Sequence, residues 1–240
     1  MDNAVRMEYR EQIEELAAAS RRLGELGYVT SHGGNLSCRV AQNRVLITPT
    51  KVVKRTLTPE DVCITDMDGK LLWAAEGRKP TGETPMHLRI YRKRPDAVSV
   101  VHAHPPILTG FSISGSAHLL AKPLLPEPVI EAGPVVLVEY AEPISEDLAE
   151  KFDSVLHRSN AFLMKNHGMT VCSSEGVSRA LDVLEMLEME AYSVWVAKTL
   201  GTVDSIPVDE VEKMERTLKT RSLPLPGDPR HVKRLVDQYR

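Results

Sequence analysis

Two histidines, two residues apart, follow a short apolar run that is typical of a buried strand. The run is Val98 to Val101, and the histidines are His102 and His104. Because alternate residues of a strand point to the same face, both imidazoles can reach one metal ion. A single His-x-His pair is common by chance, so this spacing needs further ligands before it predicts a metal site.

A carboxylate and a third imidazole supply such ligands. Glu83 stands shortly before Pro85, and proline is favoured in the first turn of a helix, so we expect Glu83 at or just before a helix N-terminus. His167 follows a second apolar run, residues 161–164, that leads into a turn at Gly168. Three imidazoles and one carboxylate suit zinc, manganese, cobalt or iron. The four side chains are therefore one candidate metal site.

Hydrophobic periodicity predicts the elements that must position these residues. We expect helices that begin near residues 13, 86, 145, 174 and 208, the last of which precedes a proline-rich, extended arm. Strands are expected at 37–40, 45–48, 98–101, 135–138 and 161–164, with a hairpin formed by 62–65 and 70–73. In the fourth helix we expect Glu175 in the first turn and a solvated or subunit-facing stripe of Glu185, Glu188 and Glu190.

Composition narrows the class of protein. The 240 residues carry a net charge of −3, with basic and acidic residues interspersed, which argues against a nucleic-acid-binding surface. We interpret the cluster from Arg89 to Arg94 as the solvated face and end of a helix. Three widely spaced cysteines and an N-terminal segment without an apolar run predict a cytoplasmic protein with no membrane contact. We expect one domain, residues 1–240, in which residues 201–240 form a C-terminal helix and arm.

Six collinear segments together resemble the class II aldolase/adducin family. They are Gly33-Gly34-Asn35-Leu36-Ser37, Leu46-Ile47-Thr48-Pro49-Thr50, Lys79-Pro80-Thr81-Gly82-Glu83, His87 through Arg94-Pro95-Asp96, His102-Ala103-His104 and Asn166-His167-Gly168. The resemblance covers roughly residues 8 to 200, in the family's order. It implies a three-layer αβα fold with a central, largely antiparallel sheet covered by helices, and a homotetramer with active sites near subunit contacts.

The resemblance also implies roles for individual residues. His102, His104, His167 and Glu83 match the metal ligands, with zinc as the expected ion, and Glu83 also matches the catalytic acid/base. The positions that match the family's anion-binding segments are Gly34, Asn35, Thr50, Lys51, Thr81 and Gly82. Two of them depart from the usual pattern, because Lys51 stands where sugar-phosphate aldolases usually carry glycine and Gly82 where they carry serine. A lysine pairs with phosphate or carboxylate, so the nature of the anion stays open.

These expectations describe a metal-dependent lyase. A divalent ion with an open position can bind the oxygens of a small anionic ketose and stabilise an enediolate, which makes cleavage of the adjacent carbon–carbon bond accessible. Decarboxylation or dehydration of a hydroxylated acid, or 4-epimerisation of a pentulose phosphate, could use the same ion. An adducin-like protein without enzyme activity is a further alternative, although the chain retains every metal and acid/base position.

Overall fold

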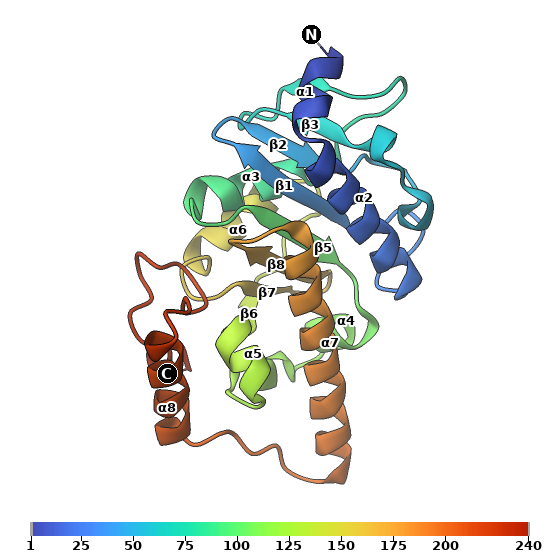
Figure 1. Ribbon diagram of the computed structural model, residues 1–240. Helices are drawn as coiled ribbons and strands as arrows, with labels where there is room; N and C mark the ends of the chain where they lie inside the picture. The colour runs from blue at the N-terminus through green and yellow to red at the C-terminus, as the bar shows by residue number, and fades with distance from the viewer. Residues whose placement is uncertain (1, 240) are drawn as a thin grey trace.

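A computed structural model describes residues 2–239, which fold around one eight-stranded sheet (Figure 1). The strands are β1 (Asn35–Ala41), β2 (Arg44–Ile47), β3 (Cys63–Thr65), β4 (Leu71–Trp73), β5 (Ser99–Ala103), β6 (Val136–Val138), β7 (Ala161–Met164) and β8 (Gly168–Ser173). The helices are α1 (Asp2–Glu8), α2 (Arg10–Glu25), α3 (Thr84–Lys93), α4 (Pro106–Ser112), α5 (Pro126–Glu131), α6 (Glu146–Lys151), α7 (Val177–Leu200) and α8 (Val208–Thr220). No helix within this span combines the length and apolar character that crossing a bilayer requires.

The sheet places β5, with its two histidines, between β1 and β8. The strand order is β4-β3-β2-β1-β5-β8-β7-β6, and only the β6–β7 pair is parallel. The predicted α/β architecture with a largely antiparallel central sheet is therefore confirmed. In the register of the two ladders, Asn35 lies opposite His102 on one side and Thr170 lies opposite His102 on the other.

Helices cover both faces of the sheet, and strand alternation decides which face each residue meets. One core cluster joins α2, α4 and α7 to β5 through Val101 and Ala103. A second cluster joins α3 and α6 to Val100 of the same strand. Figure 1 shows α2 and α7 crossing in front of the sheet. His102 is two residues beyond Val100, so its imidazole lies on the face that α3 covers.

Two of the three glutamates that were expected in a solvated or subunit-facing stripe of α7 are buried. Glu188 and Glu190 are 8% and 3% exposed, respectively. The carboxylate of Glu188 accepts hydrogen bonds from the backbone N–H groups of Ile107 and Leu108, so it satisfies the first turn of α4. Neighbouring segments cover α7 on more sides than the one that faces the sheet. Positions that helical periodicity assigns to solvent are therefore buried. Glu175 also precedes the helix, which begins at Val177.

Arg94 is likewise buried rather than solvated. Its guanidinium forms an ion pair with Asp96 at 2.7 Å and donates to the backbone carbonyls of Leu156 and Ser159 at 2.9 Å each. These carbonyls belong to an irregular segment that has no ladder to satisfy them, and the fork of donors on an arginine suits that task. The helix expected from residue 145 is α6, which ends at Lys151 and is followed by a 3-10 turn, Phe152–Ser154.

The proline-rich C-terminal segment folds back onto its own chain instead of extending away. Leu235 and Val236 are buried in a cluster with Val129 of α5 and with apolar residues of α8. Gln238 adds a hydrogen bond from its side-chain amide to the carbonyl of Pro226 at 2.8 Å. The predicted helix near residues 208–218 is confirmed as α8, whereas the arm expected after it packs against α5 and α8.

Candidate metal centre

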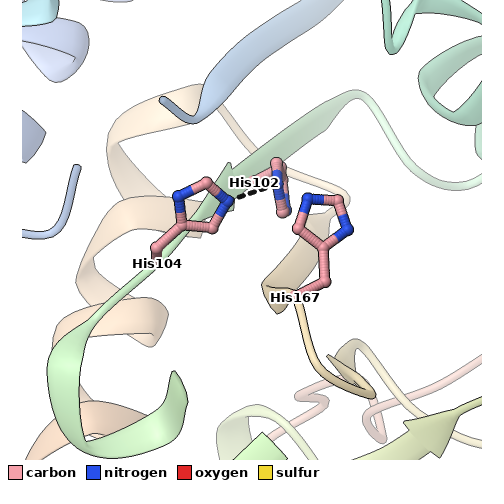
Figure 2. Close-up of side chains that lie close together, drawn as sticks. All are labelled: His102, His104 and His167. Carbon is pink, nitrogen blue, oxygen red and sulfur yellow. Dashed lines mark hydrogen bonds between the residues drawn. The ribbon is translucent and has the colours of Figure 1, made fainter. Parts of the chain in front are cut away.

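The three predicted histidines converge, as Figure 2 shows. His102 lies in β5, His104 directly follows that strand, and His167 lies in the turn between β7 and β8. One nitrogen of each ring can be chosen so that all three lie within 4.8 Å of one another. The Nε2 atoms of His102 and His104 are 3.1 Å apart. The arrangement could hold one metal ion.

The surroundings of the three imidazoles favour the neutral state that binds metals. Burial lowers the pKa of all three rings below the usual range for histidine, most strongly for His102, and the neighbouring imidazoles lower the pKa of His102 and His104 further. Nδ1 of His102 lies 3.0 Å from the carbonyl oxygen of Met169, to which it donates its proton, so Nε2 keeps its lone pair. A hydrogen bond of this kind on the far nitrogen orients a metal-binding imidazole.

Glu83 closes the cluster at the N-terminus of α3, where the sequence places it. It is the N-cap residue of that helix and is 8% exposed. Its Oε2 lies 3.4 Å from Nε2 of His102, and its Oε1 lies 3.5 Å from Nε2 of His167. Within residues 2–239, Oε1 is buried and has no hydrogen-bond partner. A cation between these atoms would satisfy that oxygen, so the donor set fits a divalent metal.

A glycine makes the approach of His167 to the β5 histidines possible. A Cβ atom on Gly168 would lie 2.4 Å from Cδ2 of His104 and 2.5 Å from the carbonyl oxygen of Ala103. Such contacts exclude any side chain at this position. The turn that the sequence predicts at Gly168 lies slightly earlier in the structure. Asn166 has a positive φ of 55°, and Gly168 is already the first residue of β8.

The predicted anion-binding segments lie beside one another and lead into Glu83. Residues 48–51 and 79–82 are joined by hydrogen bonds from the Thr50 N–H to the Lys79 carbonyl at 2.9 Å and from the Thr81 N–H to the Thr48 carbonyl at 3.1 Å. Lys51 is exposed and has a φ of 57°, a left-handed conformation that favours glycine. The unusual lysine therefore occupies a strained, exposed position next to the paired segments.

The glycine turn before β1 packs directly against the histidines. Gly34 has a φ of 67°, and a Cβ there would lie 2.9 Å from the carbonyl oxygen of His102. A Cβ on Gly33 would lie 3.1 Å from Nδ1 of His104. The absence of a Cβ therefore lets this turn pack closely against the end of β5. Its contact with a substrate stays a prediction.

Asn35 has partners that the sequence does not reveal. Its amide is buried, with Nδ2 donating to Oε2 of Glu83 at 2.7 Å and Oδ1 lying 2.5 Å from Nε2 of His87. Its amide is therefore arranged to hold Glu83 rather than to donate to an oxyanion. His87 was missed as a site residue, although its spacing of four from Glu83 on one helix could have indicated it.

Comparisons with known proteins agree with this geometry. Residues 14–194 match the family model of the class II aldolase and adducin N-terminal domain. A 3-oxo-tetronate 4-phosphate decarboxylase of Haemophilus influenzae is 34% identical over 179 residues, which are 74% of this chain and 84% of that protein. A 5-deoxy-D-ribulose 1-phosphate aldolase of Bacillus thuringiensis is 31% identical over 212 residues, or 85% of this chain and 93% of that one.

A solved structure shares the fold as well. An L-fuculose 1-phosphate aldolase superposes with a TM-score of 0.78 at 25% sequence identity, covering 87% of this chain and 96% of that chain. The matched region contains Glu83 and all three histidines of the centre. By sequence and by fold, the chain belongs to the class II aldolase and adducin family.

Proposed function

We propose that this protein is a metal-dependent lyase that cleaves a carbon–carbon bond in a small anionic sugar. One observation carries the proposal: the carboxylate of Glu83 lies within 3.5 Å of two imidazoles of a triad that could hold a cation, and one of its oxygens has no other partner. A carboxylate and a candidate ion-binding triad thus lie side by side. Relatives in the family catalyse aldol cleavage or decarboxylation, and both reactions place negative charge beside a carbonyl carbon.

His102, His104 and His167 would hold the ion, with Glu83 as a fourth ligand before substrate binds. We expect zinc, with manganese, cobalt and iron as the alternatives that this donor set also suits. The bound ion would act as a Lewis acid that stabilises the negative charge developing on the substrate oxygens. Three neutral imidazoles leave the full charge of the ion available for that purpose.

Glu83 would transfer the proton at the reacting carbon or oxygen. Asn35 holds Oε2 at 2.7 Å, so the unpartnered Oε1 is the oxygen free to accept and return a proton. The N-cap position fixes the backbone of Glu83 at the end of α3. A carboxylate anchored on one oxygen and free on the other is suited to general acid–base catalysis.

The anionic end of the substrate would lie against the paired segments that precede Glu83. Gly34, Thr50, Thr81 and Gly82 would offer backbone or hydroxyl donors, and Lys51 would add a positive charge. Because Gly82 lacks the hydroxyl of the usual serine, Lys51 is the proposed source of the missing interaction. Either a phosphate or a carboxylate could bind there.

Decarboxylation is the second candidate, because a decarboxylase is among the relatives that are more than 30% identical to this chain. The departure of the anion segments from the sugar-phosphate aldolase pattern also favours it. Epimerisation and an adducin-like, non-enzymatic role remain further outcomes of the test. Metal-replete protein should be assayed with ketose 1-phosphates, pentulose phosphates and phosphorylated 3-oxo-acids. Aldehyde release supports an aldolase, carbon dioxide release a decarboxylase and isomeric product an epimerase, whereas absence of both turnover and bound metal would reject the proposal.

We also propose that the protein assembles as a homotetramer. An apolar row on α7 supports association, since Met189, Tyr192 and Trp195 are 63%, 46% and 52% exposed and Leu200 is 84% exposed. Exposed apolar surface of this kind marks interaction sites. Size-exclusion chromatography with light scattering would give the mass of the assembly. A monomeric mass at micromolar concentration would contradict this proposal.

A further inference from the structure

A row of buried polar side chains leads away from Glu83 between β1 and α3. Glu83, His87 and Tyr91 follow one another at intervals of four along the helix, and Asn35 and Ser37 are two apart on the strand. One helical step of four residues rises about 6 Å and two strand residues rise about 6.7 Å, so the two series stay in step. Each strand side chain can therefore lie between two helix side chains.

Four short contacts join the row. Nδ2 of Asn35 is 2.7 Å from Oε2 of Glu83, and Oδ1 of Asn35 is 2.5 Å from Nε2 of His87. Oγ of Ser37 is 2.7 Å from Nδ1 of His87 and 2.7 Å from the hydroxyl of Tyr91. His87 and Ser37 are fully buried and Tyr91 is 1% exposed. Bulk water therefore cannot replace the hydrogen bonds that these groups make to one another.

The carboxylate fixes the direction of every hydrogen bond in the row. Because Glu83 can only accept, Asn35 turns its NH₂ group toward Glu83 and its carbonyl oxygen toward His87. His87 must then carry its proton on Nε2, and full burial between two uncharged partners, Asn35 and Ser37, favours the neutral ring. Its Nδ1 consequently accepts from the Ser37 hydroxyl, which in turn accepts from Tyr91. All donors point toward Glu83.

We propose that His87, oriented by Ser37 and Tyr91, is a positioning residue that acts through Asn35 to hold Oε2 of Glu83 and leave Oε1 to the reaction. This inference rests on the proposed function of Glu83. The row anchors only one of the two carboxylate oxygens, whereas a network serving packing alone would satisfy both. It does not relay protons, since an amide neither takes up nor releases protons near neutral pH. Its contribution is orientation and aligned dipoles.

The tautomer of His87 tests the direction of the row without any substrate. In zinc-loaded protein labelled with ¹⁵N-histidine, the spectrum at neutral pH should show His87 as a neutral ring with its proton on Nε2. A ring protonated on Nδ1, or on both nitrogens, would overturn the proposal. If the wild-type protein turns over none of the candidate substrates, the tautomer still decides the direction of the row independently of the proposed function.

Paired variants test the effect on Glu83. His87→Leu removes the donor to Asn35, whereas His87→Gln keeps an N–H group that can serve it. We expect His87→Leu to weaken zinc binding and to lower kcat by about tenfold or more, with KM within about twofold, and we expect His87→Gln to recover most of the loss. Equal behaviour of the two folded variants would reject positioning by hydrogen bonding.

A gentler pair covers the case in which His87→Leu does not fold. Ser37→Ala removes the hydroxyl that holds Nδ1 of His87. Ser159→Ala is the matched control, because Ser159 is also fully buried, and its hydroxyl bonds the backbone of Ala132 and Ala161 far from Glu83 in the hydrogen-bond network. Ser37→Ala alone should lower zinc affinity and kcat. The same loss in both variants would show a general effect of destabilisation and overturn the inference.

Discussion

Replacing Glu83 by glutamine isolates the proton-transfer group, because the change keeps the shape of the side chain. In the native protein, Nδ2 of Asn35 donates to Oε2 of Glu83 at 2.7 Å. The glutamine carbonyl can take the place of Oε2 and accept the same hydrogen bond. Its NH₂ group then takes the place of Oε1, which lies 3.5 Å from Nε2 of His167. An amide nitrogen has no free lone pair with which to accept a proton. The variant should fold and should retain metal on the three imidazoles.

The expected loss is that of one general acid–base group. Such a group contributes about 10²–10⁴-fold, which corresponds to about 2.7–5.5 kcal/mol of transition-state stabilisation. The assay is steady-state turnover of the best substrate, with metal content measured on the same sample. Glu190→Gln is the matched control, since burial raises the pKa of Glu190 to about 8 and the native side chain is already neutral at pH 7. If metal-loaded Glu83→Gln keeps more than about a tenth of wild-type turnover, the base lies elsewhere.

Three further predictions follow from other parts of the molecule. His167→Ala should lower metal affinity by about tenfold or more, and chelation should abolish wild-type activity; elemental analysis that finds no metal in active protein would contradict this. Lys51→Gly removes the charge and suits the φ of 57°, so a rise in KM of about 10–100-fold with little change in kcat would reflect the lost ion contact, whereas an unchanged KM would reject it. Glu190 is protonated in the folded state up to a pKa of about 8 but ionises near 4.5 when unfolded, so its contribution to stability is complete below about pH 4.5 and is lost as the pH rises to about 8. Denaturant unfolding should show this decline, on the order of 4 kcal/mol, in the wild type and not in Glu190→Gln.

The sequence by itself predicted that His102, His104, His167 and Glu83 form one candidate metal site. The two-residue spacing of His102 and His104 after an apolar run is a local signal, since a strand places alternate residues on one face whatever it pairs with. Pro85 similarly marks the helix that Glu83 caps. For His167 the apolar run before it made the residue a candidate, and the collinear family segments strengthened the prediction, because nothing local indicates that the β7–β8 turn reaches β5.

The tertiary structure decided which polar residues are buried and which partners they have. Asn35 resembles a loop residue facing a ligand until α3 is packed on β1, which brings its amide between Glu83 and His87. Glu188 and Arg94 match solvated positions by periodicity, yet each is buried because it satisfies backbone groups of a segment distant in the sequence. Periodicity reports the face that an element turns toward its own sheet. It carries no information on which later segment covers the opposite face, and that covering fixes the hydrogen bonds of these side chains.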